Sequence, residues 1–271
     1  MDLDDLPDLP EHESAYYLRT GPDTFAPTLN CQGAWNVHEQ HMAPVSGLLA
    51  HAITSHEART DVTLARVTFE ILGLIPALET TVEVRTIRPG RTIELVEAVA
   101  SAGGRPVVRA HAWRLSRQDT TTIAGGLPAP LPDPATCLPW TASAMWAGGY
   151  IRSIEVVRSP GEHDGAGQAW IRTQLALVDG EEVAPSAAYL GLVDTANGMN
   201  TRLDPRDWAF PNIDVSVHLY REPHGGPGEW VGFDTLVTVG EEGVGLTSTT
   251  LHDAAGPAGR CEQILTVRPL G

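Results

Sequence analysis

The sequence predicts an α+β fold built twice on one plan, in which an apolar helix is followed by an antiparallel meander of strands. Apolar residues recur at helical spacing over 44–57 and surround the stretch 186–197 on nearly every side, which predicts two helices, the second of them buried. After each helix, hydrophobic residues alternate with a period of two over successive segments. Proline and glycine crowd residues 125–139, between the two halves. We therefore expect two central helices, each wrapped by an antiparallel sheet.

These patterns divide the chain into four parts. Residues 1–14 are acidic and punctuated by proline, which predicts a disordered tail. Residues 15–124 form the first half, residues 125–139 a Pro/Gly-rich linker, and residues 140–271 the second half. The halves repeat an architecture and share little residue identity.

The first half is expected to begin with a short strand within 16–25. Pro44 then suits the first turn of the helix, where a residue without an N–H group breaks no intrahelical bond. R-P-G-R at 88–91 and Gly103-Gly104 mark turns between strands. The four strands expected after the helix are 66–72, 80–87, 92–100 and 107–115.

The second half carries strand-like segments at 150–157 and 168–178 ahead of its helix. Ser186 fits the N-cap of this helix, and Asn197-Gly198 supplies a left-handed stop at its end. The four strands expected after it are 213–220, 230–239, 245–252 and 261–268.

The composition excludes several classes of function. A formal net charge of −16 argues against binding to nucleic acid and against docking on an anionic membrane. Three cysteines far apart in the chain, Cys31, Cys137 and Cys261, predict neither a disulfide framework nor a metal cluster. The acidic N-terminus is unlike a signal peptide, and no stretch is long and apolar enough to span a membrane. We expect a cytoplasmic protein that forms a homodimer or higher homo-oligomer.

Asp194 is the ionisable group on the second helix. A carboxylate on so apolar a helix loses solvation, so it must be paired, hydrogen-bonded or kept for chemistry. The alternative is that Asp194 sits near the helix end and bonds the backbone amides of the Asn197-Gly198 turn. This segment leaves both interpretations open.

Two polar positions on the last strands are further candidates. Gln263 shares a strand face with Cys261, Leu265 and Val267, so a buried amide there needs partners, in a site or on a neighbouring strand. Thr238 lies on a mixed face of its strand. Thr235 lies on the more apolar face, and a shifted register would make it the inward hydroxyl instead.

Six stretches, taken with their spacing, carry a resemblance to a known family. They are W-N-V-H-E-Q-H-M-A-P-V-S-G-L-L-A-H-A-I at 35–53, V-E-V-R-T-I-R-P-G-R-T-I-E-L-V-E-A at 82–98, L-V-D-T-A-N-G-M-N at 192–200, V-H-L-Y-R-E-P at 217–223, G-E-W-V at 228–231 and D-A-A-G-P-A-G-R-C-E-Q-I-L-T-V at 253–267. The chain resembles the acyl-CoA thioesterase II-like family of double (tandem) hot-dog proteins from about residue 15 onward.

The resemblance implies hydrolysis of an acyl-CoA thioester to free acid and coenzyme A, without metal or cofactor. In this family a carboxylate on the second hot-dog helix works with a Thr or Ser and a Gln from the surrounding sheet. By position these fall on Asp194, Thr238 and Gln263, with Asp194 as base toward water or as the group that holds it. The aliphatic Ile53 occupies the equivalent of Asp194 in the first helix, so one site per chain is expected.

The start of the first helix departs from the family pattern. Relatives commonly read Gln-His-Gly-Gly there, and this chain keeps Gln40 and His41 but has Met42 and Ala43 in place of the glycines. Backbone N–H groups at this helix end would polarise the thioester carbonyl, so these four residues are the expected substrate-binding set.

Two other functions remain open. The two larger side chains at Met42 and Ala43 motivate a non-catalytic acyl-CoA or acyl-chain binding protein. Hot-dog folds also host a hydratase or dehydratase with an Asp-His pair; no histidine lies within one helical turn of Asp194, but distant strands could supply one.

Further polar residues suggest other sites or ligand contacts. His38-x-x-His41 has no third ligand at a convincing spacing, so no metal site is expected. Arg202, Arg206 and Arg221 suit either coenzyme A phosphates or surface salt bridges.

Overall fold

The first half of the chain folds as six strands and one long helix in the computed structural model, which describes residues 8–161 and 164–270. The strands are β1 (Ala15–Arg19), β2 (Thr24–Pro27), β3 (Val62–Ile71), β4 (Thr80–Arg88), β5 (Ile93–Ala102) and β6 (Arg105–Ser116), and the helix is α1 (Met42–Ser55), with a 3-10 turn η2 at Leu29–Cys31. Gly103 and Gly104 join β5 to β6 with φ values of 60° and 77°. A two-residue hairpin turn with positive φ at both positions favours glycine, as the sequence predicts.

The second half contains more and shorter elements. Its strands are β7 (Leu138–Pro139), β8 (Ile154–Arg158), β9 (Ala166–Thr173), β10 (Ala176–Val178), β11 (Trp208–Ala209), β12 (Asp214–Leu219), β13 (Val231–Val239), β14 (Val244–Asp253), β15 (Gly256–Thr266) and β16 (Arg268–Pro269). Its helices are α2 (Gly149–Ser153), α3 (Pro185–Val193) and α4 (Ala196–Met199), and 3-10 turns lie at η3 (Thr121–Ile123), η4 (Pro134–Thr136) and η5 (Ala142–Ala144).

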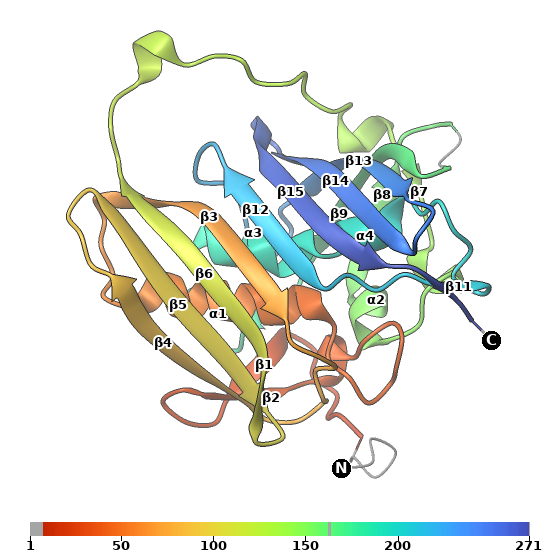
Figure 1. Ribbon diagram of the computed structural model, residues 1–271, viewed down its shortest axis with the longest axis horizontal. Coiled ribbons are helices and arrows are strands. Elements are labelled where there is room, and N and C mark those ends of the chain that lie inside the picture. Colours follow the sequence, from red (N-terminus) through yellow and green to blue (C-terminus); the bar gives the residue numbers. More distant parts are fainter. Residues whose placement is uncertain (1–7, 162–163, 271) are drawn as a thin grey trace.

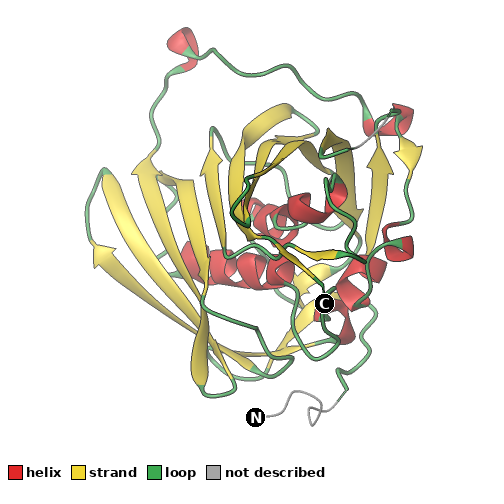
Figure 2. Cartoon of the chain, turned by 45° about the vertical axis from the view of Figure 1, so that its right-hand side comes forward, coloured by secondary structure: helices red, strands yellow, loops and turns green. Residues whose placement is uncertain are grey.

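One continuous sheet runs through both halves. Fourteen of the described strands lie in it, in the order β10-β1-β2-β4-β5-β6-β3-β12-β15-β14-β13-β9-β8-β7. The halves meet where β3 pairs antiparallel with β12, with Val67 opposite Val217. Figure 1 shows these strands passing from one half to the other, and Figure 2 shows them curving around the helices. The expected α+β class, with long antiparallel strands around buried helices, is confirmed.

Helices α1 and α3 pack directly against each other inside this sheet. Gly47 makes the close approach possible, because a Cβ added there would lie 2.8 Å from Gly191 Cα. The Ser46 hydroxyl donates to the Leu190 carbonyl at 3.0 Å, so a hydrogen bond also links the helices. Most apolar side chains of α1 are buried around this contact, for example Val45 and Leu48. The helix pair thereby fixes how the first half sits on the second.

The boundaries of both helices differ from the expected ones. α1 starts two residues before the expected position, because the His41 side chain caps it by accepting from the Ala43 N–H at 3.1 Å. In α3, Pro185 is the first residue and Ser186 the second, so Ser186 is not the N-cap. Asn197 and Gly198 lie inside α4 instead of ending a helix. Long-range bonds hold them there: the Asn197 side chain donates to Phe210 O and accepts from Thr247.

Residues 150–157, expected as a strand, begin as a helix. α2 covers Gly149–Ser153 and β8 follows it. The Tyr150 N–H donates to the Gln32 carbonyl at 3.2 Å, and a Cβ at Gly149 would collide with the Leu29 carbonyl. Packing against η2, far away in sequence, therefore overrides the local β pattern.

Residues 8–14, the described part of the expected disordered tail, make long-range backbone hydrogen bonds. Residues 1–7 lie outside the described residues. The carbonyls of Pro10 and Ser14 accept from the N–H groups of Leu29 and Ala176, both at 2.7 Å. The segment therefore joins η2 to the start of β10. The adjacent strands β1 and β10 pair in parallel, with Ala15 opposite Ala176, whereas the sequence suggested antiparallel pairing throughout.

The Pro/Gly-rich stretch is an exposed connection along most of its length. Figure 1 shows it arching from β6 across to the second half. At its end the Trp170 indole donates to the Pro132 carbonyl at 2.9 Å, and Leu138-Pro139 forms the short strand β7. Across 8–161 and 164–270, no helix is long and apolar enough to cross a membrane.

Candidate active site

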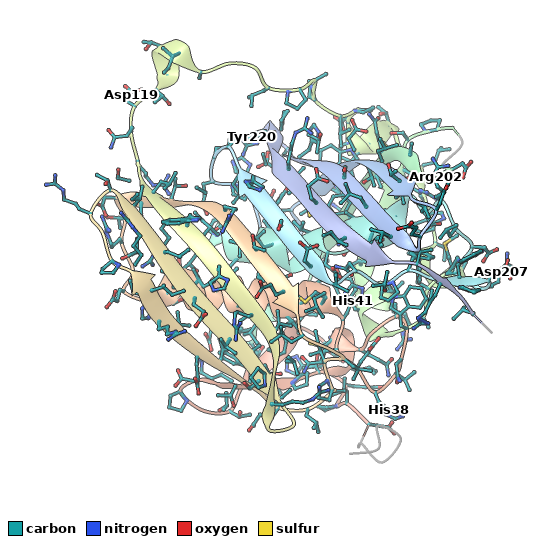
Figure 3. The ribbon with its side chains drawn as sticks, viewed as in Figure 1. His38, His41, Asp119, Arg202, Asp207 and Tyr220 are labelled. Atoms are coloured by element: carbon teal, nitrogen blue, oxygen red, sulfur yellow. The ribbon has the colours of Figure 1, made fainter. Side chains whose placement is uncertain are left out.

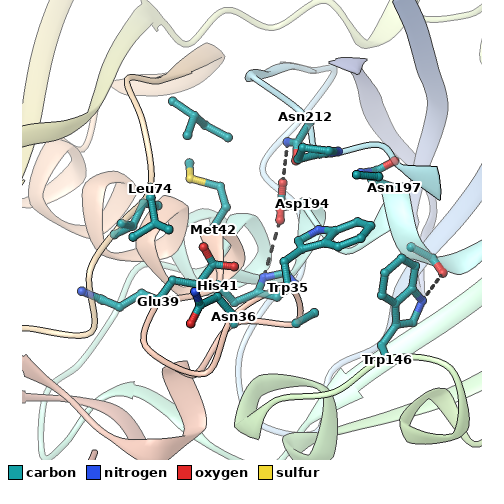
Figure 4. A pocket seen from close by; sticks show the side chains of 18 of the residues that line it. Trp35, Asn36, Glu39, His41, Met42, Leu74, Trp146, Asp194, Asn197 and Asn212 are labelled. Carbon is teal, nitrogen blue, oxygen red and sulfur yellow. Dashed lines mark hydrogen bonds and ion pairs between the residues drawn. The ribbon is translucent and has the colours of Figure 1, made fainter. Parts of the chain in front are cut away.

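A cavity of about 590 Å³ opens where the start of α1, the break between α3 and α4, and the start of β12 come together. Most of its walls come from residues within 33–42, 71–75, 194–199 and 209–213, and Trp146, Ile151, Arg268 and Leu270 complete them. Figure 3 places His41 near the middle of the molecule, between the two sets of strands, and Figure 4 shows the cavity from close by. Both halves of the chain therefore contribute to one site.

Asp194 lies at the C-terminal end of α3, is 6% exposed, and faces this cavity. Its Oδ1 accepts from Asn212 Nδ2 at 2.8 Å and from Gln263 Nε2 at 3.2 Å. Gln263 also donates to the Asp194 backbone carbonyl at 3.1 Å. The carboxylate is thus held by two side-chain amides from the sheet. The Asp194 side chain therefore does not bond the backbone amides of residues 197–198, which was the alternative interpretation.

Burial raises the pKa of the Asp194 carboxyl to about 6, although the hydrogen bonds from Asn212 and Gln263 act to lower it. Desolvation is the larger effect. A carboxylate with a pKa in this range is ionised at neutral pH and still basic enough to take a proton from a reacting group.

His41 provides the opposite wall of the site. Its Nδ1 lies 3.5 Å from Asp194 Oδ2, and its ring stacks on Tyr150 with centroids 4.1 Å apart. Nδ1 also accepts from the Ala43 N–H, so the ring hydrogen belongs on Nε2. Burial lowers the pKa of His41 to about 3, so the imidazole is neutral at physiological pH. The dashed lines in Figure 4 join Asp194 to both His41 and Asn212.

The other residues expected at the start of α1 differ in what they can offer. Gln40 lines the cavity, but its amide is already engaged, accepting from the Tyr17 hydroxyl at 2.8 Å and donating to Pro76 O and Thr80 Oγ1. Ala43 is fully buried. Met42 lines the cavity directly. Gln40 therefore shapes the wall, and Met42 is the residue placed to meet a ligand.

Thr238 is not brought to the site. The inward residues of β13 are Val231, Phe233, Thr235 and Val237, so Thr238 points outward and is exposed. Thr235 is buried, but its hydroxyl bonds that of Thr249 at 3.2 Å, and it does not line the cavity. β14 also separates β13 from the strand of Gln263. The assignment of the hydroxyl to Thr238, or to Thr235, is therefore corrected.

Asn212 occupies the place where a hydroxyl was expected. It lies two residues before β12, and β12 pairs with β15, the strand that carries Gln263. Its Nδ2 also donates to the Asp214 carbonyl at 3.2 Å, which fixes its orientation. The sequence signal was weak: a single polar residue between Pro211 and Ile213, just outside the expected strand.

The rest of the cavity is largely apolar, and two of its lining residues, Trp35 and Trp146, belong to an aromatic cluster that Phe210 completes behind the wall. Trp35, Trp146 and Phe210 meet edge to face, with ring centroids 5.2 to 5.8 Å apart. Trp146 Nε1 donates to the Gly198 carbonyl at 3.0 Å, which ties the cluster to α4. A second carboxyl, Glu39, also lines the cavity, and burial raises its pKa to about 7.

The arginines singled out in the sequence are engaged elsewhere. Arg221 forms a bidentate pair with Asp253, Arg206 pairs with Asp204, and Arg202 donates to the Val237 carbonyl. Within the described ranges, no three His, Cys, Asp or Glu side chains are placed to hold a metal ion.

Comparison with known families matches most of the chain. A model of the acyl-CoA thioesterase N-terminal domain matches residues 31–115, and one of the acyl-CoA thioesterase C-terminal domain matches residues 134–267. No curated protein sequence matches the chain.

Solved structures share the fold at low sequence identity. A conserved protein of unknown function with a hot-dog fold from Alicyclobacillus acidocaldarius is 14% identical, with a TM-score of 0.73 over 93% of this chain and 96% of that one. An acyl-CoA thioesterase II from Mycobacterium marinum is 15% identical, with a TM-score of 0.61 over 94% of this chain and 96% of that one. At these identities the likeness shows the fold alone.

Proposed function

Since the chain belongs to the acyl-CoA thioesterase family, we propose that it hydrolyses an acyl-CoA thioester to the free acid and coenzyme A in the cavity that Asp194 lines. The observation that carries this proposal is the buried carboxylate held by Asn212 and Gln263 at one wall, opposite the start of α1. In the proposed tandem hot-dog plan, each half of the chain supplies one wall of this site.

Asp194 acts as the general base toward water. Asn212 and Gln263 hold its Oδ1, which leaves Oδ2 to accept a proton from a water in the cavity. The water oxygen forms a bond to the thioester carbonyl carbon as its proton passes to Asp194. When the tetrahedral intermediate collapses, the C–S bond breaks and the proton on Asp194 goes to the departing thiolate. These steps balance in atoms and protons without a metal or cofactor.

The start of α1 stabilises the oxyanion. The first N–H groups of a helix have no partner inside it. In α1 the Ala43 N–H already donates to His41 and Pro44 has no N–H, so Met42 supplies the first-turn amide for the carbonyl oxygen. The helix dipole adds to this interaction. A methionine side chain in place of glycine then narrows the space beside the thioester.

The test is free thiol release across a series of acyl-CoA chain lengths, with equilibrium binding measured on the same substrates. Wild-type protein should release thiol from at least one of them, and Asp194→Asn should bind that substrate but turn it over roughly 10²-fold more slowly. If wild type binds acyl-CoA at micromolar concentration and releases no thiol, the protein is a binding protein instead.

A hydratase or dehydratase is the second candidate, favoured by the 3.5 Å approach of His41 to Asp194. The histidine that no local pattern supplied comes from the other half of the chain. Such an enzyme would add water across the double bond of an enoyl-CoA and leave the thioester intact. Loss of enoyl absorbance without thiol release would identify it. The opposite result, thiol release without loss of the double bond, supports hydrolysis.

A further inference from the structure

The exposed side of the cavity, which we call its mouth, is bordered by Arg268 and Leu270, two exposed residues of the last described segment. β16 pairs antiparallel with β11, which sets Arg268 opposite Ala209. Directly after β16, the Leu270 N–H donates to the Asp207 carbonyl at 2.8 Å, which also holds this segment in place. Arg268, Leu270 and Ala209 all line the cavity. Backbone pairing therefore holds the Arg268 side chain at an entrance that leads to Asp194.

Arg268 is the permanent cation of this cavity. Of the described residues that line it, the other ionisable side chains are the carboxyls Glu39 and Asp194 and the neutral His41. The chain as a whole carries a formal charge of −16. An anionic ligand that enters here is repelled by the protein at long range and needs a local positive charge to be held.

The guanidinium of Arg268 is exposed, and among the described residues it has neither an ion-pair nor a hydrogen-bond partner. This distinguishes it from the three arginines singled out in the sequence, Arg202, Arg206 and Arg221. Arg206 and Arg221 are each neutralised by an aspartate, and Arg202 is bound to a backbone carbonyl. Arginine that keeps its five donors free suits a phosphate group, which it can bind through two parallel hydrogen bonds.

We infer that Arg268 binds a phosphate group of coenzyme A at the mouth while the thioester lies beside Asp194. This assignment rests on the proposed function, because it takes the thioester carrier to be the phosphorylated one. The apolar and aromatic walls hold the acyl group, and Arg268 selects the carrier. Thioesters whose carrier arm lacks phosphate lose this contact and keep the rest of the site.

The test compares Arg268→Gln with Arg206→Gln, which removes the same charge from an exposed side chain already paired with Asp204. For acyl-CoA, Arg268→Gln should raise KM about threefold to tenfold with kcat within about twofold, since one exposed charge-assisted contact is lost. For the matching acyl-pantetheine thioester, which has no phosphate, KM should stay unchanged. Arg206→Gln should match wild type on both substrates.

Binding of free coenzyme A, measured by calorimetry, separates this inference from the proposed hydrolysis. Arg268→Gln should weaken the Kd for coenzyme A by a similar factor, and the wild-type Kd should rise more steeply with salt than that of the variant. Equal KM values and equal Kd values for wild type and Arg268→Gln would overturn the inference even if thiol release is robust. Conversely, weakened coenzyme A binding in Arg268→Gln would support it even if no thioester is cleaved.

Discussion

Asp194 Oδ2 lies 3.5 Å from His41 Nδ1, so the end of α3 in the second half meets the start of α1 in the first. These two side chains are far apart in sequence and come from helices that pack directly on each other. A site built at such a junction exists only when both halves are folded and docked. Substitutions at the contact between α1 and α3 should therefore affect activity by changing how His41 and Asp194 are placed.

Replacing Asn212 should move the loss of kcat/KM at low pH to a higher pH. Its hydrogen bond to Asp194 Oδ1 lowers the pKa of that carboxyl, so Asn212→Leu should raise the pKa and reduce the ionised fraction at a given pH. We expect kcat/KM for acyl-CoA hydrolysis to fall at pH 6 and to recover part of the loss at pH 8. The measurement is thiol release by this variant and wild type at both pH values.

Two substitutions serve as controls for that experiment. Asn212→Ser keeps a polar group beside the carboxylate and should lose less activity than Asn212→Leu. Thr238→Val changes an exposed residue on the outer face of β13 and should leave kcat/KM unchanged. A large loss in Thr238→Val would show that the outward position of this residue is incorrect.

The contact between α1 and α3 should be intolerant of added atoms on one side. A Cβ at Gly47 would lie 2.8 Å from Gly191 Cα and 3.2 Å from the Ala187 carbonyl, so Gly47→Ala forces the helices apart. Overpacking of this kind costs about 1–3 kcal/mol. We expect a fall in Tm of several degrees, at roughly 2–4 °C per kcal/mol for large domains.

Gly191→Ala is the matched control from the facing helix. Its added Cβ would meet Gly47 Cα at 3.5 Å, an ordinary van der Waals distance, and alanine favours the helix by about 1 kcal/mol over glycine. Its Tm should equal or exceed that of wild type. If both variants lose the same stability, the asymmetric contact does not exist.

Asp194→Asn should stabilise the protein in a pH-dependent way. Burial raises the pKa of Asp194 in the folded state to about 6, above its ordinary value near 4, so the folded state binds this proton more tightly than the unfolded state. The cost of the buried charge is therefore fully present above pH 6 and disappears as the pH falls toward 4. Removing the charge should add up to about 3 kcal/mol to the free energy of unfolding at pH 7.5, and little at pH 4.

Urea unfolding of wild type and Asp194→Asn at both pH values measures this difference. His41, whose pKa burial lowers to about 3, destabilises the folded state of both proteins as the pH falls, but it is neutral in both at pH 7.5 and does not contribute to the difference there. A variant that is less stable than wild type at pH 7.5 would contradict the buried-charge account.

Periodicity predicted the parts of the fold that repeat. The strands after α1 and after α3 lie within a few residues of their expected bounds, because alternation reports a buried face directly. Asp194 and Gln263 were also predictable, since each is a polar group in an apolar setting, and the structure brings them together at 3.2 Å.

Other features depend on contacts that no local pattern reports. Tyr150 is helical because Gln32 and Leu29 lie against it, and Asn197 stays inside α4 because Phe210 and Thr247 bond its side chain. Asn212 reaches Asp194 through the pairing of β12 with β15, which brings residues far apart in the chain side by side. Thr238 was assigned by resemblance and lies on the outward face of β13, and the inward Thr235 is kept from Gln263 because β14 lies between the two strands.

The pH dependence of kcat/KM for acyl-CoA hydrolysis tests most directly whether the Asp194 carboxylate is the base. Wild type should lose activity below an apparent pKa near 6, and Asp194→Asn should be roughly 10²-fold slower and lack this limb. Glu39→Gln is the control, because Glu39 lines the same cavity with a pKa raised to about 7, and this variant should keep the limb near 6. An Asp194→Asn variant with the wild-type rate and the same limb would contradict the account.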